Sequence, residues 1–414
     1  MRILSPYDGM ACGMLAMQAA GITVSRYVAY EIDKYAVRTS THNFPMIEHR
    51  GDVFQADFTE FRGFDFVIGG SPCTYWSIAQ TNNRETEASG IGWELFKQYV
   101  RAVKEAQPKY FIYENNKSMS KAIRESITQT FGFEPICINS ALVSAQNRQR
   151  LYWVGKRNLD GTYSRVHVNQ PKDLGVLIRD VLTVGIHLNP TISEKLRTVD
   201  SHMGKLENNL LPRMNHTNPA KQQYDCIVEP VLCVIECGTM KVREATKKGY
   251  TEIHPWECVD LTQPNSKTRR GRNMAEKSNC LMTSCQFWQY CGVLGYATPC
   301  EWDEFGRPIK AVSSADGKIY PVYEVKDGQI TIKDNRYPVK LVDNFYITRK
   351  LTVKECMRLQ TVPEWYEFPV ADSQAYKMLG NGWTIEVIAH LIKATQTNEL
   401  ADNQMDLFKM AGVM

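Results

Sequence analysis

The 414-residue sequence lacks any apolar run of about eighteen residues, the length that a membrane-spanning helix needs. Its N-terminus also lacks a basic stretch followed by an uninterrupted apolar core, so we expect no secretory signal peptide. The 12 cysteines are not regularly spaced, which argues against a disulfide scaffold. These absences predict a protein of the cytoplasm with reduced thiols and no membrane partner.

A large excess of positive charge is missing as well. The 49 Lys and Arg residues face 45 Asp and Glu residues, and the net charge of +4 is too small to establish a nucleic-acid partner. Hydrophobic residues make up 43% of the chain, an ordinary value for a globular protein. The length predicts two or three domains.

Short apolar runs and helical stretches alternate over residues 1–155. The apolar runs are the expected strands, at residues 2–5, 27–31, 64–68, 110–113, 135–138 and 151–154. Helical patterning is clearest at residues 93–106 and 118–130. This alternation predicts an α/β fold with a doubly wound, mostly parallel sheet, whose ligands bind at the carboxyl ends of the strands.

The regular alternation fails after residue 180. Residues 185–345 are rich in Asn, Thr, Lys, Cys and Pro. The pieces with a recognisable pattern are two strand-like runs and two helical stretches, at residues 231–235, 319–323, 352–359 and 384–393. We therefore predict one domain of residues 1–180, completed by residues 372–414, and an inserted irregular domain of residues 181–371.

The most informative short stretch is Gly69-Gly70-Ser71-Pro72-Cys73, directly after a buried strand. A cysteine there would lie at the functional edge of the sheet, where nearby cations would favour the nucleophilic thiolate. Taken alone, a Pro-Cys pair more often marks a small packed hydrophobe.

Two other stretches favour the nucleophile. Glu114 ends the strand at residues 110–113, and Arg148 and Arg150 precede the strand at residues 151–154. Read separately, Glu114 would indicate a capped strand, and Arg148 and Arg150 would indicate solvated charges. Together, a nucleophile, a carboxyl group and fixed cations suit attack on an electron-poor ring.

The order of the motifs resembles the DNA (cytosine-5-)-methyltransferase family, bacterial or phage type. The matching stretches are Tyr7 to Gly13, Glu31 to Ala36, Gly51 to Val53, Gly70 to Cys73, Glu114-Asn115, Gln146 to Arg150, Arg349 to Gln360 and Gly380 to Trp383. Each motif alone is weak or moderate, but eight in the correct order exclude chance.

The resemblance implies chemistry at cytosine C5. Cys73 would attack C6, Glu114 would contact N3 and the amino group, and Arg148 and Arg150 would fix the base and its backbone. The methyl group would come from S-adenosyl-L-methionine, leaving S-adenosyl-L-homocysteine, and loss of the C5 proton would expel Cys73. Because a stacked duplex hides these atoms, the mechanism implies base flipping at a cost of a few kcal/mol.

The resemblance also implies a pocket for S-adenosyl-L-methionine. The residues assigned to it are Tyr7, Asp8, Gly9, Gly13, Glu31, Ile32, Asp52, Val53, Pro72, Asn381 and Trp383. Glu31 would hold the ribose hydroxyls and Asp52 the adenine amino group, and Gly9 and Gly13 permit a tight turn. Without the other motifs, these glycines would indicate only a structural turn between a strand and a helix.

This sequence departs from the family pattern at several positions. Tyr7 replaces the usual phenylalanine, and Ile32 stands where some relatives stack an aromatic ring on the adenine. Asn116 replaces a common valine, and Trp383 replaces a smaller apolar residue. None of these changes removes a catalytic group.

The inserted domain falls where the family keeps its target-recognition domain, which implies double-stranded DNA as a partner. Basic residues crowd one stretch of it, and the residues predicted to contact DNA are Ser77, Gln146, Arg269, Arg270 and Arg272. A basic cluster can neutralise phosphates or read guanine edges, although it equally indicates a solvated face. The 8 cysteines from Cys226 to Cys300 include no Cys-x-x-Cys pair, so we expect no structural zinc.

Three other functions fit these residues less well. An amino-directed DNA methyltransferase needs a second proline where Cys73 stands. A tRNA cytosine-5 methyltransferase usually shows Pro-Pro-Cys rather than Ser71-Pro72-Cys73, with a smaller recognition region. A noncatalytic DNA-binding relative has no need of a nucleophile. A cognate restriction endonuclease is the further partner that the resemblance suggests, in a bacterial cytoplasm beside the nucleoid.

Overall fold

The computed structural model divides into two compact units. The first comprises Met1–Val143, Arg148–Leu174 and Gln360–Met414, and the second comprises Ser144–Asn147 and Gly175–Leu359. The described residues are 1–77, 84–176, 178–181, 183, 227–230, 240–253, 267–268, 270, 278–279, 297–332, 335–338, 343–349 and 351–410. The strand predicted at residues 231–235 lies outside them. Within these ranges, no helix is long and apolar enough to span a membrane.

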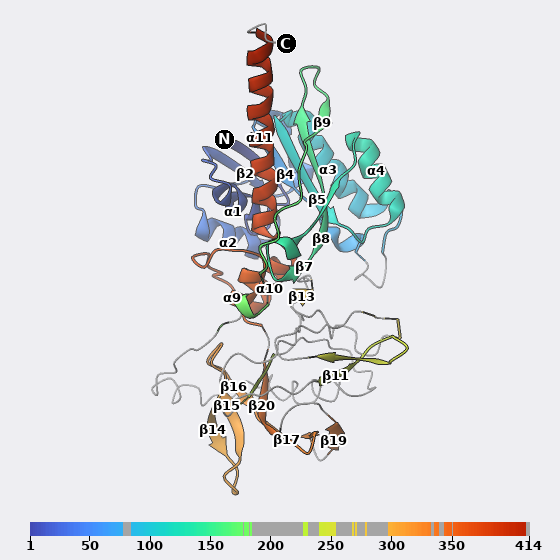
Figure 1. Cartoon of the computed structure of the whole chain (residues 1–414). Coiled ribbons are helices and arrows are strands. Elements are labelled where there is room, and N and C mark those ends of the chain that lie inside the picture. Colours follow the sequence, from blue (N-terminus) through green and yellow to red (C-terminus); the bar gives the residue numbers. More distant parts are fainter. Residues whose placement is uncertain are drawn as a thin grey trace. The chain divides into compact units, whose positions relative to one another are not determined.

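An eight-stranded sheet forms the centre of the first unit (Figure 1). Its strands are β1 (Arg2–Pro6), β2 (Arg26–Tyr30), β3 (Glu48–His49), β4 (Phe66–Gly69), β5 (Tyr110–Asn116), β6 (Ile136–Asn139), β8 (Gln149–Arg157) and β9 (Tyr163–Arg165). Their order is β3-β2-β1-β4-β5-β8-β6, with β9 paired to β8. The neighbouring strands β3, β2, β1, β4 and β5 are parallel, whereas β8 runs antiparallel to both β5 and β6. The predicted α/β fold with a mostly parallel sheet is confirmed.

Helices cover both faces of this sheet. They are α1 (Cys12–Ala19), α2 (Lys34–Asn43), α3 (Gly90–Ala106), α4 (Lys121–Phe131), α10 (Asp372–Asn381) and α11 (Ile385–Met410). Neighbouring residues of a strand point to opposite faces. Phe111 of β5 packs into the cluster that contains α3 side chains, while the Tyr110 hydroxyl donates to the carbonyl of Thr395 in α11, 3.3 Å away. The two helices therefore lie on opposite faces.

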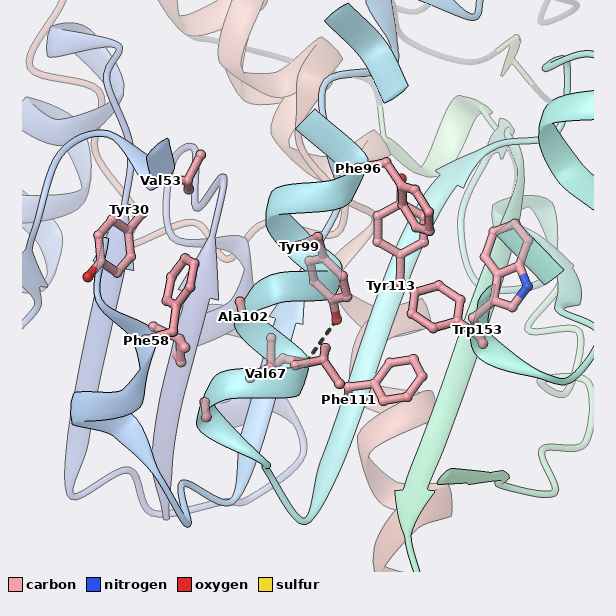
Figure 2. Close-up of a cluster of buried hydrophobic side chains, with 14 of the residues drawn as sticks. Tyr30, Val53, Phe58, Val67, Phe96, Tyr99, Ala102, Phe111, Tyr113 and Trp153 are labelled. Carbon is pink, nitrogen blue, oxygen red and sulfur yellow. Dashed lines mark hydrogen bonds between the residues drawn. The ribbon is translucent and has the colours of Figure 1, made fainter. Parts of the chain in front are cut away.

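Aromatic side chains fill the space between α3 and the sheet (Figure 2). Phe96 and Tyr99 of α3 pack against Phe111 and Tyr113 of β5, and all four are fully or almost fully buried. The Tyr99 hydroxyl contacts two carbonyls, 3.1 Å away on β4 and 2.8 Å away on β5. This core holds β4 and β5 in register up to the ends where Gly70 and Glu114 lie.

The second unit is built mainly from antiparallel strands. A five-stranded sheet has the order β10-β20-β17-β18-β19, with β10 at Ile227–Pro230, β17 at Tyr323–Lys326, β18 at Gln329–Ile332, β19 at Asn335–Pro338 and β20 at Asn344–Arg349. The other elements are β14 (Thr298–Trp302), β15 (Pro308–Val312) and β16 (Ile319–Pro321) in one sheet, the β11 (Met240–Arg243) and β12 (Tyr250–Ile253) pair, the β7 (Gln146–Asn147) and β13 (Ser278–Asn279) pair, and helices α5 (Ile178–Val181) and α9 (Val353–Leu359).

The structure moves the ends of several predicted elements. Strand β5 continues through Asn116, so Glu114 lies inside the strand rather than after it. The physical reason is its partner β8, which pairs with β5 as far as Asn116 opposite Arg150. Helix α3 begins at Gly90, three residues before the predicted stretch.

Candidate active site

The site of interest begins at the carboxyl ends of β1 and β4. These strands are neighbours, but the chain continues from β1 to β2 on one side and from β4 to β5 on the other. In a doubly wound sheet, such a reversal of strand order leaves a crevice where ligands bind. The stretch Tyr7 to Gly13 follows β1, and Gly70 to Cys73 follows β4.

Gly70 brings the end of β4 unusually close to β5. A Cβ added at Gly70 would lie 2.7 Å from the backbone oxygen of Glu114 and 2.9 Å from its side-chain Oε2. Neither distance is compatible with a real side chain, so the close approach requires glycine at this position. The Glu114 carboxylate therefore lies directly beside the turn that leads to Cys73.

Side-chain hydrogen bonds fix that turn. The Ser71 hydroxyl lies 2.7 Å from the Tyr113 hydroxyl, and the Asn115 amide donates to the Ser71 carbonyl at 3.2 Å and to the Tyr113 hydroxyl at 3.1 Å. All three residues are buried. Pro72 follows with φ −48° and ψ 119°, and Cys73 opens a short 3₁₀ helix, Cys73–Tyr75.

Cys73 is partly exposed, and charged residues surround its thiol. Burial is the largest effect and raises the pKa of the Cys73 thiol. The positive charges of Arg150 and Arg148 oppose this effect, whereas the negative charge of Glu114 adds to it. The Asn116 amide lies 3.5 Å from the Cys73 carbonyl. Cys73, Glu114, Arg148 and Arg150, which the sequence places far apart in three stretches, thus form one electrostatic cluster.

Glu114 is held through both of its carboxylate oxygens. Nε of Arg150 lies 3.1 Å from Oε1, and Nε1 of the Trp383 indole donates to Oε2 at 3.0 Å. The side chains of Glu114 and Arg150 are 11% and 14% exposed, so the pair is shielded from water but can be reached by a ligand.

Arg148 and Arg150 have different surroundings although they are two residues apart. Arg148 is 3% exposed, and its guanidinium donates to the carbonyl of Gly380 at 3.2 and 3.3 Å and to that of Gly382 at 2.7 Å. Arg150 instead pairs with Glu114. Arg148 thus anchors the loop after α10, and Arg150 is the arginine beside the carboxylate.

The loop after β1 carries three residues in the left-handed region. Tyr7, Gly9 and Ala11 have φ angles of 62°, 60° and 61°. Glu31, at the end of β2, accepts a hydrogen bond from the Gly9 amide at 2.9 Å, and its other oxygen accepts from the amides of Ile32 and Asp33. The Glu31 carboxylate therefore fixes the loop after β1 and lies at the carboxyl end of β2.

The residues after β2 and β3 fit an adenosine group. Asp52 places a carboxylate there, and its Oδ1 accepts from the Phe54 amide at 3.0 Å. Ile32 is 77% exposed and Phe54 47%, which is unusual for large apolar side chains next to a sheet edge. Carboxylates suit hydroxyl and amino donors, and the exposed apolar groups suit the faces of a purine ring. Val53, by contrast, is buried.

Asp8 lies in the same loop, but its side chain is buried. Its Oδ1 accepts from the Tyr27 hydroxyl at 2.7 Å, and Oδ2 has no hydrogen-bond partner among the described residues. Burial raises the pKa of Asp8 to about 7, and the Tyr27 hydrogen bond only partly offsets this. A Cβ on Gly13 would collide with the same Tyr27 hydroxyl, so Gly13 is needed for packing.

The structure places the other predicted residues as follows. Tyr7 donates through its hydroxyl to the Leu95 carbonyl at 2.8 Å, and Asn381 is the last residue of α10. The Ser77 amide donates to the Cys73 carbonyl at 3.0 Å. Gln146 belongs to the second unit, where its buried amide donates to the Leu359 carbonyl at 2.9 Å. Arg270 is exposed, and Arg269 and Arg272 lie outside the described residues.

Sequence reasoning missed the contacts that three residues make at this site. Asn115 and Tyr113 brace the turn before Cys73, although only the neighbouring Glu114 had been assigned a role. The indole of Trp383 reaches Glu114, a contact between residues 269 positions apart. The only sequence signal for the contact between Trp383 and Glu114 was that tryptophan replaces a smaller residue at position 383.

The chain is similar to known proteins over almost its whole length. The profile of the family described as C-5 cytosine-specific DNA methylase matches residues 1–397. The orphan methyltransferase M.SPRI of Bacillus phage SPR is 24% identical, covering 95% of this chain and 97% of its own. The type II methyltransferase M.FnuDI of Fusobacterium nucleatum is 25% identical, covering 96% of each. A crystal structure of a Spodoptera frugiperda DNMT2 mutant shares the fold, with a TM-score of 0.50, 16% identity and coverage of 95% and 98%.

Proposed function

Because this chain belongs to the C-5 cytosine-specific DNA methylase family and is a DNA (cytosine-5-)-methyltransferase, we propose how its residues perform the reaction. In this proposal, the enzyme methylates C5 of a flipped cytosine in a specific duplex sequence, through a covalent bond between Cys73 and C6. The observation that carries it is the convergence of Glu114 and Arg150 beside Cys73 at the end of β4.

Cys73 is the nucleophile of the proposed mechanism. Its thiol loses a proton, and the sulfur forms a bond with C6, which moves the electrons of the C5–C6 double bond toward C5 and the ring nitrogen. Because burial raises the pKa of this thiol, the thiolate depends on the positive charges of Arg150 and Arg148. After C5 has been substituted, its proton leaves and the bond between sulfur and C6 breaks.

Glu114 is proposed to bind the cytosine ring at N3 and the exocyclic amino group. Oε2 accepts one hydrogen bond, from Trp383, and Oε1 lies 3.1 Å from Nε of Arg150, so acceptor capacity remains for the amino group. N3 is itself an acceptor, so the contact at N3 forms when the Glu114 carboxyl group carries a proton. Arg150 holds the carboxylate in place and is the arginine closest to the ring. Arg148 would act indirectly rather than on the ring, because its guanidinium binds the carbonyls of Gly380 and Gly382.

The cofactor is proposed to be S-adenosyl-L-methionine, which supplies an electrophilic methyl group on a sulfonium when it is bound. Glu31 would bind the ribose hydroxyls, and Asp52 would bind the adenine amino group. Ile32 and Phe54 would cover the purine ring, since both are exposed at the edge of the sheet. The backbone of the loop around Gly9, with Asn381 and Trp383, would line the methionine end. Asp8 contributes only through its backbone, because its carboxyl group is buried against Tyr27.

The second unit is proposed to recognise double-stranded DNA. It contains the exposed Arg270 and, outside the described residues, Arg269 and Arg272 of the same basic stretch. The match to a type II methyltransferase supports a cognate restriction endonuclease as a partner, in a bacterial cytoplasm. The match to a phage enzyme named as an orphan methyltransferase supports action without such a partner.

The test of this function is methylation of duplex DNA with labelled S-adenosyl-L-methionine, followed by mapping of the modified positions. We expect C5-methylcytosine in one short sequence context and none from Cys73→Ala. We also expect a covalent complex with duplexes that contain 5-fluorocytosine, because fluorine cannot leave C5 as a cation. Methylation by Cys73→Ala at the wild-type rate would refute the assignment of the nucleophile.

A further inference from the structure

We propose that Trp383 is a positioning residue for Glu114, which fixes the orientation of the carboxylate before the base binds. This inference rests on the proposed function and adds a residue that acts through Glu114 rather than on the cytosine. It is carried by the hydrogen bond from Nε1 of the indole to Oε2 of Glu114, 3.0 Å long.

The two donors on Glu114 come from different parts of the first unit. Arg150 belongs to β8 and contacts Oε1, whereas Trp383 lies between α10 and α11 and contacts Oε2. One donor on each oxygen fixes the plane of a carboxylate, which a single donor leaves free to rotate about its last bond. Trp383 is therefore the residue that completes the orientation of Glu114.

The indole is itself held firmly. Trp383 is only 9% exposed, and an indole N–H can donate but not accept, so it needs a buried acceptor such as Glu114. Its backbone amide lies 3.4 Å from Sγ of Cys12 in α1. Arg148 binds the carbonyls of Gly380 and Gly382 just before it. Contacts from Cys12 of α1 and from Arg148, just before β8, thus fix the backbone that carries the indole.

This geometry has a consequence for the cofactor. The same stretch, Gly380 to Trp383, is proposed to line the methionine end of the cofactor pocket. Trp383 is therefore a direct connection between that pocket and the carboxylate that binds the cytosine. We infer that loss of the indole N–H lowers the rate of addition to C6 while leaving the affinity for the cofactor nearly unchanged.

The experiment removes the N–H with little change of shape. Replacement of Trp383 by benzothienylalanine puts sulfur in place of the nitrogen, and Trp383→Phe is the simpler second variant. Trp153→Phe is the matched control, because Trp153 is fully buried and its Nε1 donates to the Thr128 hydroxyl, 3.3 Å away. Thermal melting of each variant shows that it is folded.

Two rates are measured for each protein. The first is exchange of tritium from C5 of cytosine in duplex DNA without cofactor. In this reaction Cys73 adds to C6, a solvent proton binds C5, tritium leaves C5 and the bond between sulfur and C6 breaks. The second is single-turnover methyl transfer. A hydrogen bond to a charged group contributes about 1.5–3 kcal/mol, so we expect both rates to fall about 10- to 100-fold. The dissociation constant of the cofactor should change less than about 3-fold.

The outcomes separate this inference from the proposed function. Tritium exchange at the wild-type rate by the benzothienylalanine protein would overturn the inference alone. So would an equal fold loss of exchange rate when the same replacement is made in the Glu114→Gln protein, because Trp383 would then not act through Glu114. Wild-type protein that exchanges tritium from no duplex would overturn the proposed function as well. A large loss in Trp153→Phe would show that removal of any buried indole has this effect, and would also overturn the inference.

Discussion

Each compact unit contains a shielded ion pair between an arginine and a glutamate, but the two carboxylates are used differently. In the second unit, Arg349 and Glu355 are 0% exposed. Each oxygen of Glu355 accepts one hydrogen bond from Arg349 and one from a backbone amide. The amide of Thr183 donates to Oε1, and the amide of Thr352 donates to Oε2. In the first unit, Oε2 of Glu114 accepts one hydrogen bond, from Trp383, and Oε1 lies 3.1 Å from Nε of Arg150 in an ion pair.

This difference separates a structural carboxylate from one that can bind a ligand. A carboxylate has about four positions at which it can accept hydrogen bonds. Glu355 uses all of them within its own unit, so a ligand could bind only by breaking a buried contact. Glu114 has two such partners, Arg150 and Trp383, and its side chain is 11% exposed, so acceptor capacity remains for a ligand. This difference in the number of partners, rather than the presence of an ion pair, supports Glu114 as the carboxylate that we propose to be functional.

The largest effect is expected from Glu114→Gln. An amide keeps the size of the side chain but loses the negative charge and the proton that the carboxyl group can exchange with N3. We expect methyl transfer to slow by roughly 10²- to 10⁴-fold, the usual contribution of a general acid or base. The free energy of unfolding should also fall, by up to about 3–5 kcal/mol, because the Glu114 charge is removed from beside the shielded Arg150 guanidinium. Single-turnover kinetics and urea unfolding measure the two effects.

Glu48→Gln is the matched control for that experiment. Glu48 also pairs with an arginine, Arg26 at 2.8 Å, but both side chains are 39% exposed. Its replacement should leave methyl transfer unchanged. Equal losses of activity in both variants would remove the distinction drawn for Glu114.

A loss of stability rather than of chemistry is expected from Glu355→Gln. This replacement removes the Glu355 charge from beside the buried Arg349 guanidinium, which costs about 3–5 kcal/mol of unfolding free energy. The double variant Arg349→Met/Glu355→Leu should be less destabilised, because neither charge remains. Urea unfolding compares the two proteins. A single variant more stable than the double would contradict the structural role of this pair.

The effect expected from Asp8→Asn depends on pH. Asp8 accepts one hydrogen bond, from Tyr27, and burial raises its pKa to about 7 in the folded protein. The unfolded value is near 3.8, so the folded state holds the proton more tightly and its contribution to stability is lost as the pH rises toward 7. Wild type should lose about 1.4 kcal/mol per pH unit between pH 4 and 7 relative to Asp8→Asn.

Urea unfolding of both proteins at pH 5, 6 and 7 measures this difference. A constant difference in unfolding free energy across that range would show that Asp8 is ionised throughout. Tyr27→Phe is a useful companion variant, since it removes the hydroxyl that donates to Asp8.

Much of the first unit followed from local sequence patterns. Buried strands such as β4 are continuous apolar runs, and Gly70, directly after β4, marks the place where the backbone must approach β5. Asp33 caps α2 in the way that is usual for an aspartate before a helix, and its side chain accepts from the Tyr35 amide at 2.9 Å. The second unit offered no such regular pattern, because short antiparallel strands depend on pairing between distant segments.

The sequence alone determined which chemical groups this enzyme carries and on which strand ends they lie, because strand patterning and turn glycines are local properties. It could not separate Arg148 from Arg150, which share an alternating pattern but bind different partners. It also could not show that an indole near the end of the chain orients Glu114. Those assignments needed the tertiary structure, because they depend on which distant segments the packing of α10, α11 and β8 brings together.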